Sequence, residues 1–392
     1  MHIENIGNKC CGCRVCEQKC KHGAIAFIND KYGFEYPRVD AEKCVNCAQC
    51  ESVCPIVNAE ELAEPLFGGV AYALDEKVKY NGSSGGLFGI FAENVIKKNG
   101  IVFGAAFDDN LKLKTQKAET VEELVPLYKS KYLLCDTRGQ FDVIEAELKK
   151  GRLVLYCSAP CQIAALKLYL KKEYANLLAI DFVCHGVGSQ TLFDKSIAYT
   201  EGKDGIRIKK VILRYKLKKA SSHYYYYYYM KDGRAHEKTD LYFSFPYYNA
   251  YCKRLACRDS CYACKFACRH RAGDITIGDF HSIEKYCPDI DRFAGVSMLL
   301  VNTLKGKQYF EDIKTSIYWD KTDKEILYKN NRFSGVESIG KKQLEFRESI
   351  ASEPFETTVK KFLRPSRDFK KLIYYKSPRF LRKVVLKLSG MR

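Results

Sequence analysis

Residues 10–20 read Cys-Cys-Gly-Cys-Arg-Val-Cys-Glu-Gln-Lys-Cys, and residues 44–55 read Cys-Val-Asn-Cys-Ala-Gln-Cys-Glu-Ser-Val-Cys-Pro. Each stretch has three cysteines with two residues between neighbours and a fourth cysteine after three more residues, as in bacterial two-cluster ferredoxins. In such proteins the fourth cysteine of each run binds the cluster of the other run. The spacing therefore predicts two 4Fe-4S clusters, one held by Cys10, Cys13, Cys16 and Cys54 and the other by Cys44, Cys47, Cys50 and Cys20.

The segment between the two cysteine runs predicts a β-hairpin. Residues 24–28 are typical of a short strand, residues 29–33 supply turn residues, and a return strand starts at residues 34–36. A hairpin of this size would bring the two runs back to back. Lys21 stands where such runs usually carry proline, and Cys11 is left over as a spare thiol. Zinc sites usually present paired Cys-x2-Cys motifs, so zinc and structural disulfides are the weaker alternatives.

The composition favours a protein of the reducing cytosol. The 392 residues are enough for two or three domains, and the 19 cysteines fit thiolate-bound clusters. The sequence predicts neither a secretory signal nor a membrane-spanning stretch. The net charge is +18, but residues 359–392 supply +11 of it through twelve lysines and arginines against one acid. The remainder is only mildly basic, so the charge does not indicate a nucleic-acid partner.

A turn rich in serine and glycine predicts an anion site in the second part of the chain. Residues 68–74 indicate a buried strand, Ser83-Ser84-Gly85-Gly86 opens a helical pattern, and residues 101–107 indicate the next strand. This is the order of a βαβ-type unit. Backbone N–H groups of such a turn bind anions at a helix N-terminus, which suits a phosphate of a flavin or nucleotide. The alternative is an ordinary capped turn, because the spacing matches neither the Walker motif nor the dinucleotide fingerprint.

Two further predicted strands lead into cysteines. Residues 152–156 are followed by Cys161 at the start of a helix, where the helix dipole favours the thiolate. Residues 177–183 are followed directly by Cys184. Open α/β sheets place ligands at the carboxyl ends of their strands, so both cysteines are candidate cluster ligands. The alternative for each is a buried cysteine that acts as a small hydrophobic residue.

A third set of closely spaced cysteines predicts a further 4Fe-4S cluster with zinc as the alternative metal. Its three members are Cys257, Cys261 and Cys264. Cys268 could complete a local site, whereas Cys161 or Cys184 could complete a tertiary one.

Other segments carry structural predictions. Residues 121–128 and 140–149 are typical of amphipathic helices. Residues 224–229 are six consecutive tyrosines, and the Asp-Gly that follows shortly after them predicts a hairpin turn. We expect the tyrosines to form one strand with alternate rings on opposite faces. A platform for stacking bases or sugars is the weaker alternative.

The later motifs, taken in order, resemble the coenzyme F-420 hydrogenase/dehydrogenase beta-subunit family, in its bacterial form with an added ferredoxin domain. The resemblance covers nearly everything from Cys10 to about Ile350. It rests on Ser83-Ser84-Gly85-Gly86, Pro160-Cys161-Gln162, Cys184-His185-Gly186, Cys257-x3-Cys261-x2-Cys264 and Asp274-Ile275-Thr276-Ile277-Gly278-Asp279. It implies FAD in the α/β domain, a 4Fe-4S cluster beside it, and electron exchange with a partner or a soluble substrate.

The resemblance also implies a set of flavin-binding residues: Ser83, Ser84, Gly85, Gly86, Lys131, Gly278 and Asp279. Two stretches depart from the family pattern. Lys131-Tyr132-Leu133-Leu134-Cys135 replaces a frequent Lys-Tyr-Val-Gln-Ser, which removes a polar amide expected near the flavin, and Ser158-Ala159 replaces a usual Gly-Thr. Both departures bear on the substrate and on whether a deazaflavin is used.

Together these patterns predict an α+β and α/β fold. A two-cluster ferredoxin domain at residues 1–62 is followed by a mixed-sheet α/β flavin-binding domain with an iron–sulfur cluster insertion. We expect an N-terminal FAD-binding lobe at residues 63–190 and a C-terminal lobe with the third cysteine set at residues 191–350. Residues 351–392 are expected to form a basic amphipathic tail.

The predicted function is a cytoplasmic iron–sulfur flavoprotein oxidoreductase. It would pass electrons from a soluble ferredoxin-like donor through 4Fe-4S clusters to FAD and a small organic acceptor. Relatives associated with surface polysaccharides suggest a role in that metabolism. The alternative is a non-catalytic electron-transfer subunit that docks a separate catalytic partner. Residues 379–388 gather apolar side chains on one side of a helix and basic ones on the other, which favours peripheral contact with the inner face of the membrane.

Overall fold

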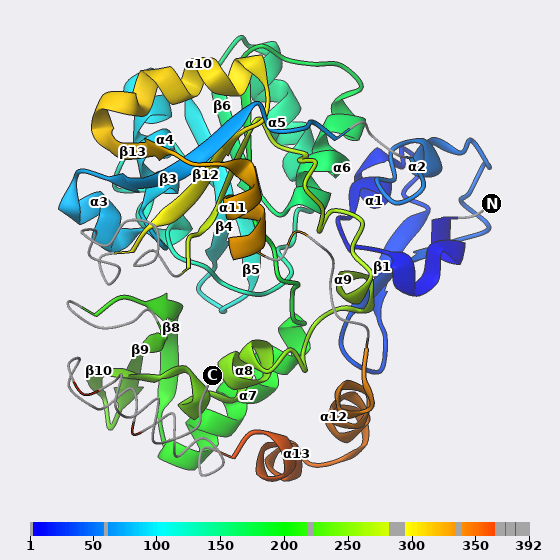
Figure 1. The fold of residues 1–392 in the computed structure, drawn as a ribbon. Coiled ribbons are helices and arrows are strands. Elements are labelled where there is room, and N and C mark those ends of the chain that lie inside the picture. Colours follow the sequence, from blue (N-terminus) through cyan, green and yellow to red (C-terminus); the bar gives the residue numbers. More distant parts are fainter. Residues whose placement is uncertain are drawn as a thin grey trace.

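The computed structural model describes residues 3–58, 62–217, 223–281, 295–331, 333, 339–364, 373 and 381. Figure 1 shows a small N-terminal module in blue, a large body built on one sheet, and a lower part that carries a second, smaller sheet. The predicted amphipathic stretch at residues 379–388 lies outside the described residues, apart from Leu381. No helix among the described residues is long and apolar enough to cross a membrane.

The N-terminal module is a ferredoxin-like domain with the predicted hairpin at its centre. Its elements are η1 (Ile3–Lys9), α1 (Val15–Lys19), β1 (Ile25–Asn29), β2 (Glu35–Val39) and α2 (Gln49–Ser52). The two strands pair antiparallel, with Ile25 opposite Val39. Each cysteine run turns into one of the short helices α1 and α2, so the hairpin brings the two runs together as predicted. The core of the module is small and includes Ile3, Ile25 and two of the cysteines.

The body is a mixed sheet of eight strands. In spatial order they are β13 (Ile317–Lys321), β3 (Phe67–Ala73), β12 (Ser297–Val301), β11 (Ile275–Asp279), β7 (Leu177–Phe182), β6 (Val154–Ser158), β4 (Ile101–Phe107) and β5 (Leu113–Ala118). Strands β11, β7, β6 and β4 are parallel neighbours, and the outer strands pair antiparallel with them or with one another. The carboxyl ends of the four parallel strands therefore share one edge of the sheet.

Helices cover both faces of this sheet, so its strands are apolar on both sides. Helices α4 (Leu87–Lys97) and α10 (Leu304–Ile313) bury Phe91 and Phe310 on one face. Helices α5 (Gln140–Lys149) and α6 (Pro160–Leu170) bury Phe141 and Ile163 on the other. Two short helices, α3 (Glu76–Asn81) and α11 (Lys324–Asn330), flank the sheet.

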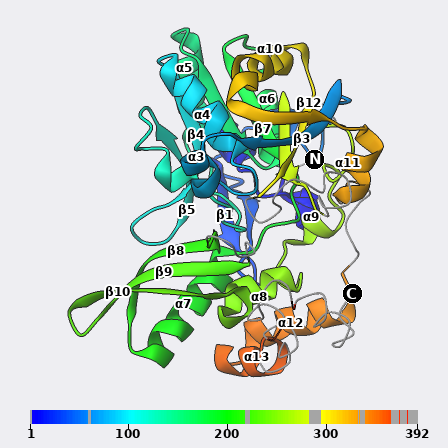
Figure 2. The same cartoon turned by 60° about the vertical axis from the view of Figure 1, so that its left-hand side comes forward.

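A second unit lies between β7 and β11 in the chain. It contains α7 (Gln190–Asp204), β8 (Arg207–Tyr215), β9 (Tyr224–Lys231), β10 (Arg234–Leu241), η3 (Tyr242–Ser244), α8 (Pro246–Cys252) and α9 (Asp259–Tyr262). The three strands form an antiparallel sheet in the order β10-β9-β8 (Figure 2). The six tyrosines form most of β9, and Tyr225 and Tyr227 are buried in a core shared with α7 and α8. The predicted tyrosine strand with alternating faces is therefore confirmed.

The last described helices pack on this second unit. They are α12 (Lys341–Ser352) and α13 (Phe355–Phe362), and Phe346 and Val359 join the core that contains the buried tyrosines. Strands from both sides of residue 190 lie in the eight-stranded sheet, because β11, β12 and β13 return to it. The part of the predicted C-terminal lobe before β11 is therefore an insertion, and the part after it completes the body.

One predicted helix is wrong. Residues 121–128 form a turn followed by the short 3-10 helix η2 (Val125–Leu127). Pro126 has no N–H to donate and disfavours helical geometry in the residue before it, so the stretch cannot continue as an α-helix. Its apolar periodicity still reflects burial, since Leu124 and Leu127 pack in the core of the body.

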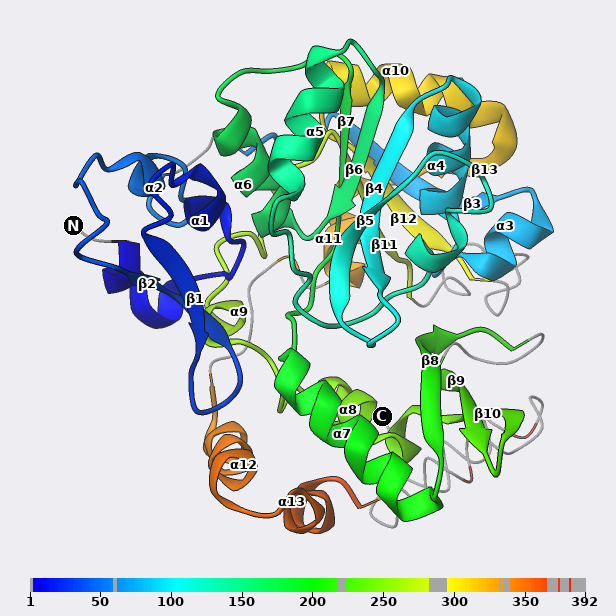
Figure 3. The same cartoon turned by 180° about the vertical axis from the view of Figure 1, so that it is seen from behind.

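The ferredoxin module lies beside the body (Figure 3). Polar contacts in α1 and just before it fix the module to the body. The Thr137 hydroxyl donates to the carbonyl oxygen of Cys13 at 2.8 Å, and the Phe141 N–H donates to the side chain of Gln18 at 3.0 Å. The Arg14 guanidinium lies 3.4 Å from the Asp136 carboxylate. These contacts reach across more than a hundred residues of sequence, so the module is held as part of one packed structure.

Candidate functional site

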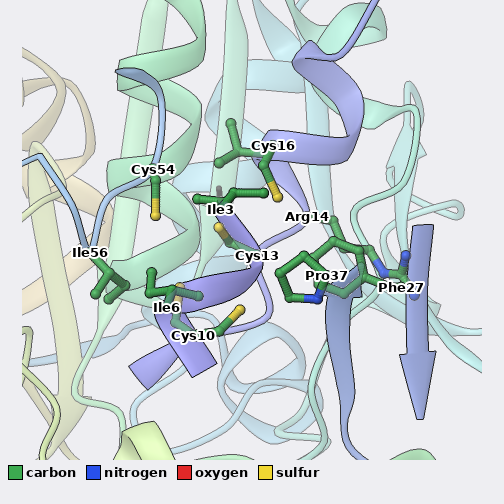
Figure 4. A pocket seen from close by; sticks show the side chains of 12 residues that line it. Ile3, Ile6, Cys10, Cys13, Arg14, Cys16, Phe27, Pro37, Cys54 and Ile56 are labelled. Carbon is green, nitrogen blue, oxygen red and sulfur yellow. The ribbon is translucent and has the colours of Figure 1, made fainter. Parts of the chain in front are cut away.

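The first cysteine group lies around one pocket in the ferredoxin module. Cys10, Cys13, Cys16 and Cys54 line it together, and Figure 4 shows their side chains gathered around the same space. Cys54 comes from the second run, so the two runs are crossed as the spacing predicts. The rest of the lining is mostly apolar: Ile3, Ile6, Val15, Phe27, Pro37 and Ile56. Four thiols around an apolar space are the donor set that a 4Fe-4S cluster takes.

The second cysteine group lies around a neighbouring pocket. Cys20 from the first run joins Cys44, Cys47 and Cys50 from the second. Cys47 is exposed, whereas most of the first group is buried. A cluster held here would therefore lie nearer the surface, where it could exchange electrons with a soluble carrier.

The environment of the sulfur atoms suits bound clusters. The Gly12 N–H lies 3.3 Å from Cys10 Sγ and the Ala24 N–H lies 3.4 Å from Cys20 Sγ, in the manner of the hydrogen bonds that tune cluster potentials. Burial raises the pKa of the Cys10 thiol to about 11. Since metal ligands must be deprotonated, such a thiol needs the positive charge of bound iron to become a thiolate. Among the described residues, no group of three or more His, Cys, Asp or Glu is arranged to hold a single metal ion.

The third cysteine set lies against the turn that follows β7. Gly186 has a φ of +98°, and a Cβ added to it would lie 2.9 Å from Cys257 Sγ and 3.2 Å from the Cβ of Cys261. The Cys184 thiol interacts electrostatically with Cys257 and Cys264, and burial raises its pKa to about 12. The structure thus brings Cys184 to the set Cys257, Cys261 and Cys264, although these residues are far apart in the chain.

The other two candidate ligands have different neighbours. The pKa of Cys161, at the start of α6, is raised by the neighbouring thiol of Cys11 and by burial, and Cys264 and Cys184 contribute to the shift. Cys268 Sγ lies 3.2 Å from the carbonyl oxygen of His270 and faces Arg271. Cys268 is therefore at the border of the group, whereas Cys161 is inside it.

Cys11 links the ferredoxin module to the third set. It is buried, and its thiol lies close to those of Cys13 and Cys161, which lower its pKa. The sequence predicted only a spare thiol here, because nothing in the spacing relates Cys11 to a helix that starts about 150 residues later. A continuous line of sulfur atoms therefore leads from the first cysteine group through Cys11 and Cys161 to Cys264.

The serine- and glycine-rich turn lies at the same edge of the sheet as the third cysteine set. It closes against the end of β3, where the Ala73 N–H donates to the Gly85 carbonyl at 2.8 Å. The Gly85 N–H donates to the Ser297 hydroxyl at the start of β12, also at 2.8 Å. A Cβ on Gly85 would lie 2.7 Å from the Ala71 carbonyl oxygen, so this glycine is required by close packing. The turn then starts α4, whose first N–H groups have no partner within the helix.

Two lysines that sequence analysis missed hold the carbonyl oxygens of this turn. Lys129 Nζ donates to the carbonyl oxygens of Tyr80 and Gly82 at 2.5 and 3.2 Å. Lys216 Nζ donates to the carbonyl oxygens of Lys79 and Ser84. Because both lysines bind carbonyl groups, they bring positive charge beside the helix start. The alternation of basic and apolar residues along β8 was the sequence signal that could have identified Lys216.

The predicted pair Gly278 and Asp279 joins the turn at the end of β11. The Asp279 carboxylate neighbours Ser84, whose hydroxyl donates to the carbonyl oxygen of Val296, and Arg214 Nη2 lies 2.7 Å from Asp279 Oδ1. Burial alone would raise the pKa of Asp279, but the Arg214 guanidinium lowers it to about 2. Burial lowers the pKa of Lys129 and of Lys216 to about 7, and neighbouring cations, Arg214 among them, contribute to both shifts.

This group forms a basic cluster beside the start of α4. Its charged members among the described residues are Lys129, Arg214, Lys216 and Asp279. A phosphate bound beside them would favour the charged forms of the two lysines and would be balanced by them and by Arg214. A helix N-terminus also favours phosphate.

Lys131 is placed differently from the other predicted flavin residues. Its ammonium group donates to the carbonyl oxygens of Leu127 and Tyr128 at 2.8 and 2.6 Å. Burial lowers its pKa to about 7, and the buried thiols of Cys135 and Cys157 lie near it. Ser83 remains linked to this segment, because its hydroxyl lies 3.0 Å from the hydroxyl of Ser130.

Comparison with known proteins finds matches for two parts of the chain. Residues 151–325 match the family model for the C terminus of the coenzyme F420 hydrogenase/dehydrogenase beta subunit, and residues 9–58 match that for the 4Fe-4S dicluster domain. A chain in a structure of the F420-reducing [NiFe] hydrogenase complex from Methanosarcina barkeri is similar, with 14% identity and a TM-score of 0.43 over 77% of this chain and 93% of that chain. No curated protein matches. The predicted family resemblance and the predicted ferredoxin domain are therefore confirmed.

Proposed function

We propose that this chain is a flavin-dependent iron–sulfur oxidoreductase. Residues 9–58 match the 4Fe-4S dicluster domain, and residues 151–325 match the C terminus of the coenzyme F420 hydrogenase/dehydrogenase beta subunit. Electrons from a soluble ferredoxin-like donor would arrive at the exposed second cysteine group. They would leave through FAD to a small organic acceptor.

The observation that carries this proposal is the line of sulfur atoms between the cysteine groups. Cys11 lies between Cys13 of the first group and Cys161, which neighbours Cys264 of the third set. Such contact supports electron transfer within one chain. The third cysteine set and the basic cluster lie at the same edge of the sheet, which supports a third cluster beside the flavin.

The protein would hold and orient the redox groups, while these supply the redox chemistry: clusters pass single electrons and the flavin transfers pairs. Ser83 to Gly86 and the start of α4 would bind the phosphates, with Lys129, Arg214 and Lys216 neutralising their charge. Buried side chains at the carboxyl ends of the parallel strands would exclude water from the site.

The direct test is anaerobic purification with iron, sulfide and flavin quantified together. We expect about twelve irons, three cubanes' worth, and about one FAD per chain. About eight irons would remove the third cluster from the proposal. An absence of flavin after reconstitution with FAD would remove the enzyme and favour the alternative, a non-catalytic subunit that docks a separate catalytic partner.

A matched pair of variants tests where the flavin phosphates bind. Lys129→Met removes a positive charge from the turn, and Lys131→Met removes one from a neighbouring site that lies against other carbonyls. We expect Lys129→Met to weaken FAD binding by about tenfold or more, since hydrogen bonds to charged groups contribute roughly 1.5–3 kcal/mol. Loss of affinity only in Lys131→Met would move the phosphates away from the turn.

The remaining expectations stay predictions. They are the cytoplasmic location, membrane contact through the tail, the role in surface-polysaccharide metabolism and the identity of the acceptor, including a deazaflavin. Anaerobic assays of the purified protein with reduced ferredoxin and candidate acceptors test the last of these. A protein that oxidises ferredoxin only when a second protein is present would favour the alternative subunit.

A further inference from the structure

Arg258 lies between the first and the third cysteine groups. It follows Cys257 directly in the chain and is fully buried, with none of its surface accessible to solvent. Its backbone N–H donates to the carbonyl oxygen of Val187, next to the turn that follows Cys184, at 2.9 Å. Its side chain points away from that turn and into the ferredoxin module, where Nε donates to the carbonyl oxygen of Cys10 at 2.7 Å.

Residues of the ferredoxin module closely surround the guanidinium group of Arg258. Nη2 donates to the carbonyl oxygen of Glu35 at 2.8 Å, and Cζ lies 4.1 Å from the ring centre of Tyr36. A Cβ added to Gly12 would lie 3.3 Å from both Cζ and Nη1 of Arg258. A side chain at position 12 would therefore displace the guanidinium, which only a glycine there accommodates.

The charge of Arg258 differs from that of the other buried arginines nearby. Arg14, Arg271 and Arg347 each form an ion pair with a carboxylate. The Arg258 side chain instead donates to two carbonyl oxygens, and its Nη1 is buried without a hydrogen-bond partner among the described residues. The groups that interact with its charge are Cys10 of the first cysteine group and Cys261 of the third, together with the leftover thiol Cys11 and Tyr36.

A buried cation of this kind acts on electron acceptors beside it. A 4Fe-4S cluster with four thiolates carries negative charge, and reduction adds one more electron. A positive charge nearby stabilises the reduced form, and the effect is strong where water is excluded. The reduction potential of such a cluster therefore rises.

We propose that the fixed positive charge of Arg258 raises the reduction potentials of both the first and the third clusters. This inference rests on the proposed function, since it requires clusters in both groups. An electron that arrives at the second cluster would then move inward to the first and onward to the third. Arg258 would set both the docking of the Cys10 loop and the direction of electron flow.

The test is a potentiometric titration of the fully loaded protein, followed by electron paramagnetic resonance. Cys47→Ser and Cys261→Ser identify the waves of the second and the third clusters. Arg258→Met should lower the midpoint potentials of the first and third clusters and leave the second unchanged. Arg258→Lys, which keeps the charge, should stay close to the natural protein. Lys31→Met removes an exposed charge from the same module and should change none of the three waves.

Substitutions of Leu134 test the same charge while Arg258 stays in place. A Cβ on Gly12 would lie 2.7 Å from Leu134 Cδ2, so Leu134 neighbours the Arg258 guanidinium. Leu134→Glu should pair with Arg258 and lower the same two potentials, whereas the neutral Leu134→Gln should not. This pair of variants decides the question if Arg258→Met fails to fold or to hold iron.

Three results would overturn the inference. They are unchanged first and third waves in a fully loaded Arg258→Met or Leu134→Glu protein, equal shifts in all three waves, and a shift in Arg258→Lys as large as that in Arg258→Met. Failure of the proposed function is recognised separately, because the natural protein would then hold only about eight irons or no flavin before any variant is made.

Discussion

Cys184 and Cys161 differ in the neighbours of their thiol groups. Cys184 follows β7, and the turn that contains Gly186 lies against Cys257 and Cys261. The thiol of Cys161 instead lies next to the leftover thiol of Cys11. We therefore expect Cys184 to be the fourth ligand of the third cluster. Cys184→Ala should lose about four irons and Cys161→Ala should keep about twelve, measured by iron and sulfide analysis after anaerobic purification.

Cys268→Ala is the control for this pair, since Cys268 lies at the border of the group and should also keep its iron. If Cys161→Ala loses the third cluster while Cys184→Ala retains it, the assignment is reversed and Cys11 becomes the neighbour of a ligand.

The carboxylate of Asp181 holds together the segment between the third cysteine set and β11. It is fully buried and accepts hydrogen bonds from the Arg271 guanidinium at 2.9 Å, the Thr276 hydroxyl at 2.6 Å and the N–H groups of Ala272 and Gly273. Asp181→Ala leaves the charge of Arg271 buried without its carboxylate, which should cost about 3–5 kcal/mol of folding stability. Urea unfolding followed by fluorescence of Trp319, the single tryptophan of the chain, measures this loss.

Trp319 suits the measurement because it packs between the sheet and a helix, against Phe67 of β3 and Phe310 of α10. Glu348→Ala is the control, since it breaks an exposed ion pair with Lys31. We expect no measurable change there, because exposed pairs contribute little. Similar losses in both variants would contradict the role assigned to burial.

Among the elements, the tip of the β1–β2 hairpin is one of the parts of the ferredoxin module that contact the insertion. Gly33 has a φ of +79°, and a Cβ on it would lie 2.3 Å from the Cβ of Thr191 in α7. Gly33→Ala should therefore separate the tip from α7 and destabilise the protein by roughly 1–3 kcal/mol, the usual cost of overpacking. The urea midpoint for loss of cluster absorbance measures the effect.

Gly23 provides a matched control in the same module. It also has a positive φ, +59°, but a Cβ there would meet no heavy atom within 4 Å. Gly23→Ala carries the backbone strain without the contact, so the difference between the two variants isolates the docking of the hairpin. Equal midpoints would show that the tip contributes nothing to the interface.

The elements also show what sequence patterns could predict. The hairpin, β3, α4, β4 and the tyrosine strand β9 were predicted from local period and turn residues, which are properties of neighbouring residues. The helix predicted at residues 121–128 was wrong because Pro126 outweighs an apolar period that has another cause, burial of Leu124 and Leu127. The return of β11, β12 and β13 to the body sheet was missed, since pairing between distant strands leaves no local pattern.

The candidate site divides in the same way. The cysteines could be named from spacing, because cluster ligation requires fixed intervals along the chain. Lys129, Arg214 and Lys216 could not be named in this way. They come together only when a strand of the insertion packs against a turn of the body. Arg258 was likewise invisible as a site, because its partners Cys10 and Glu35 lie more than two hundred residues away.

On the scale of the whole molecule, the buried lysines predict a pH dependence for the flavin-free protein. Burial lowers the pKa of Lys129, Lys131 and Lys216 to about 7, well below the ordinary value of 10.5. Above pH 7 the unfolded chain therefore binds more protons than the folded one, so stability rises with pH. We expect the urea midpoint of cluster-loaded, flavin-free protein to increase from about pH 7 to about pH 9.

Bound FAD should change this dependence. Phosphates beside Lys129 and Lys216 would raise the pKa of both lysines, so FAD affinity should be highest below pH 7 and fall as pH rises. Fluorescence titration of the flavin at several pH values measures the affinity, and Lys129→Met should reduce its pH dependence. An affinity for FAD that increases with pH would contradict phosphate binding at the basic cluster.

The close docking of the ferredoxin module has a consequence for how electron transfer responds to the solvent. A redox domain on a tether must swing between donor and acceptor, so its transfer rate falls as the medium becomes more viscous. Here Thr137, Arg14 and Arg258 fix the module against the body at residues that neighbour its cysteines. An electron injected by a light pulse into the second cluster should therefore reach the flavin at the same rate in buffer and in glycerol.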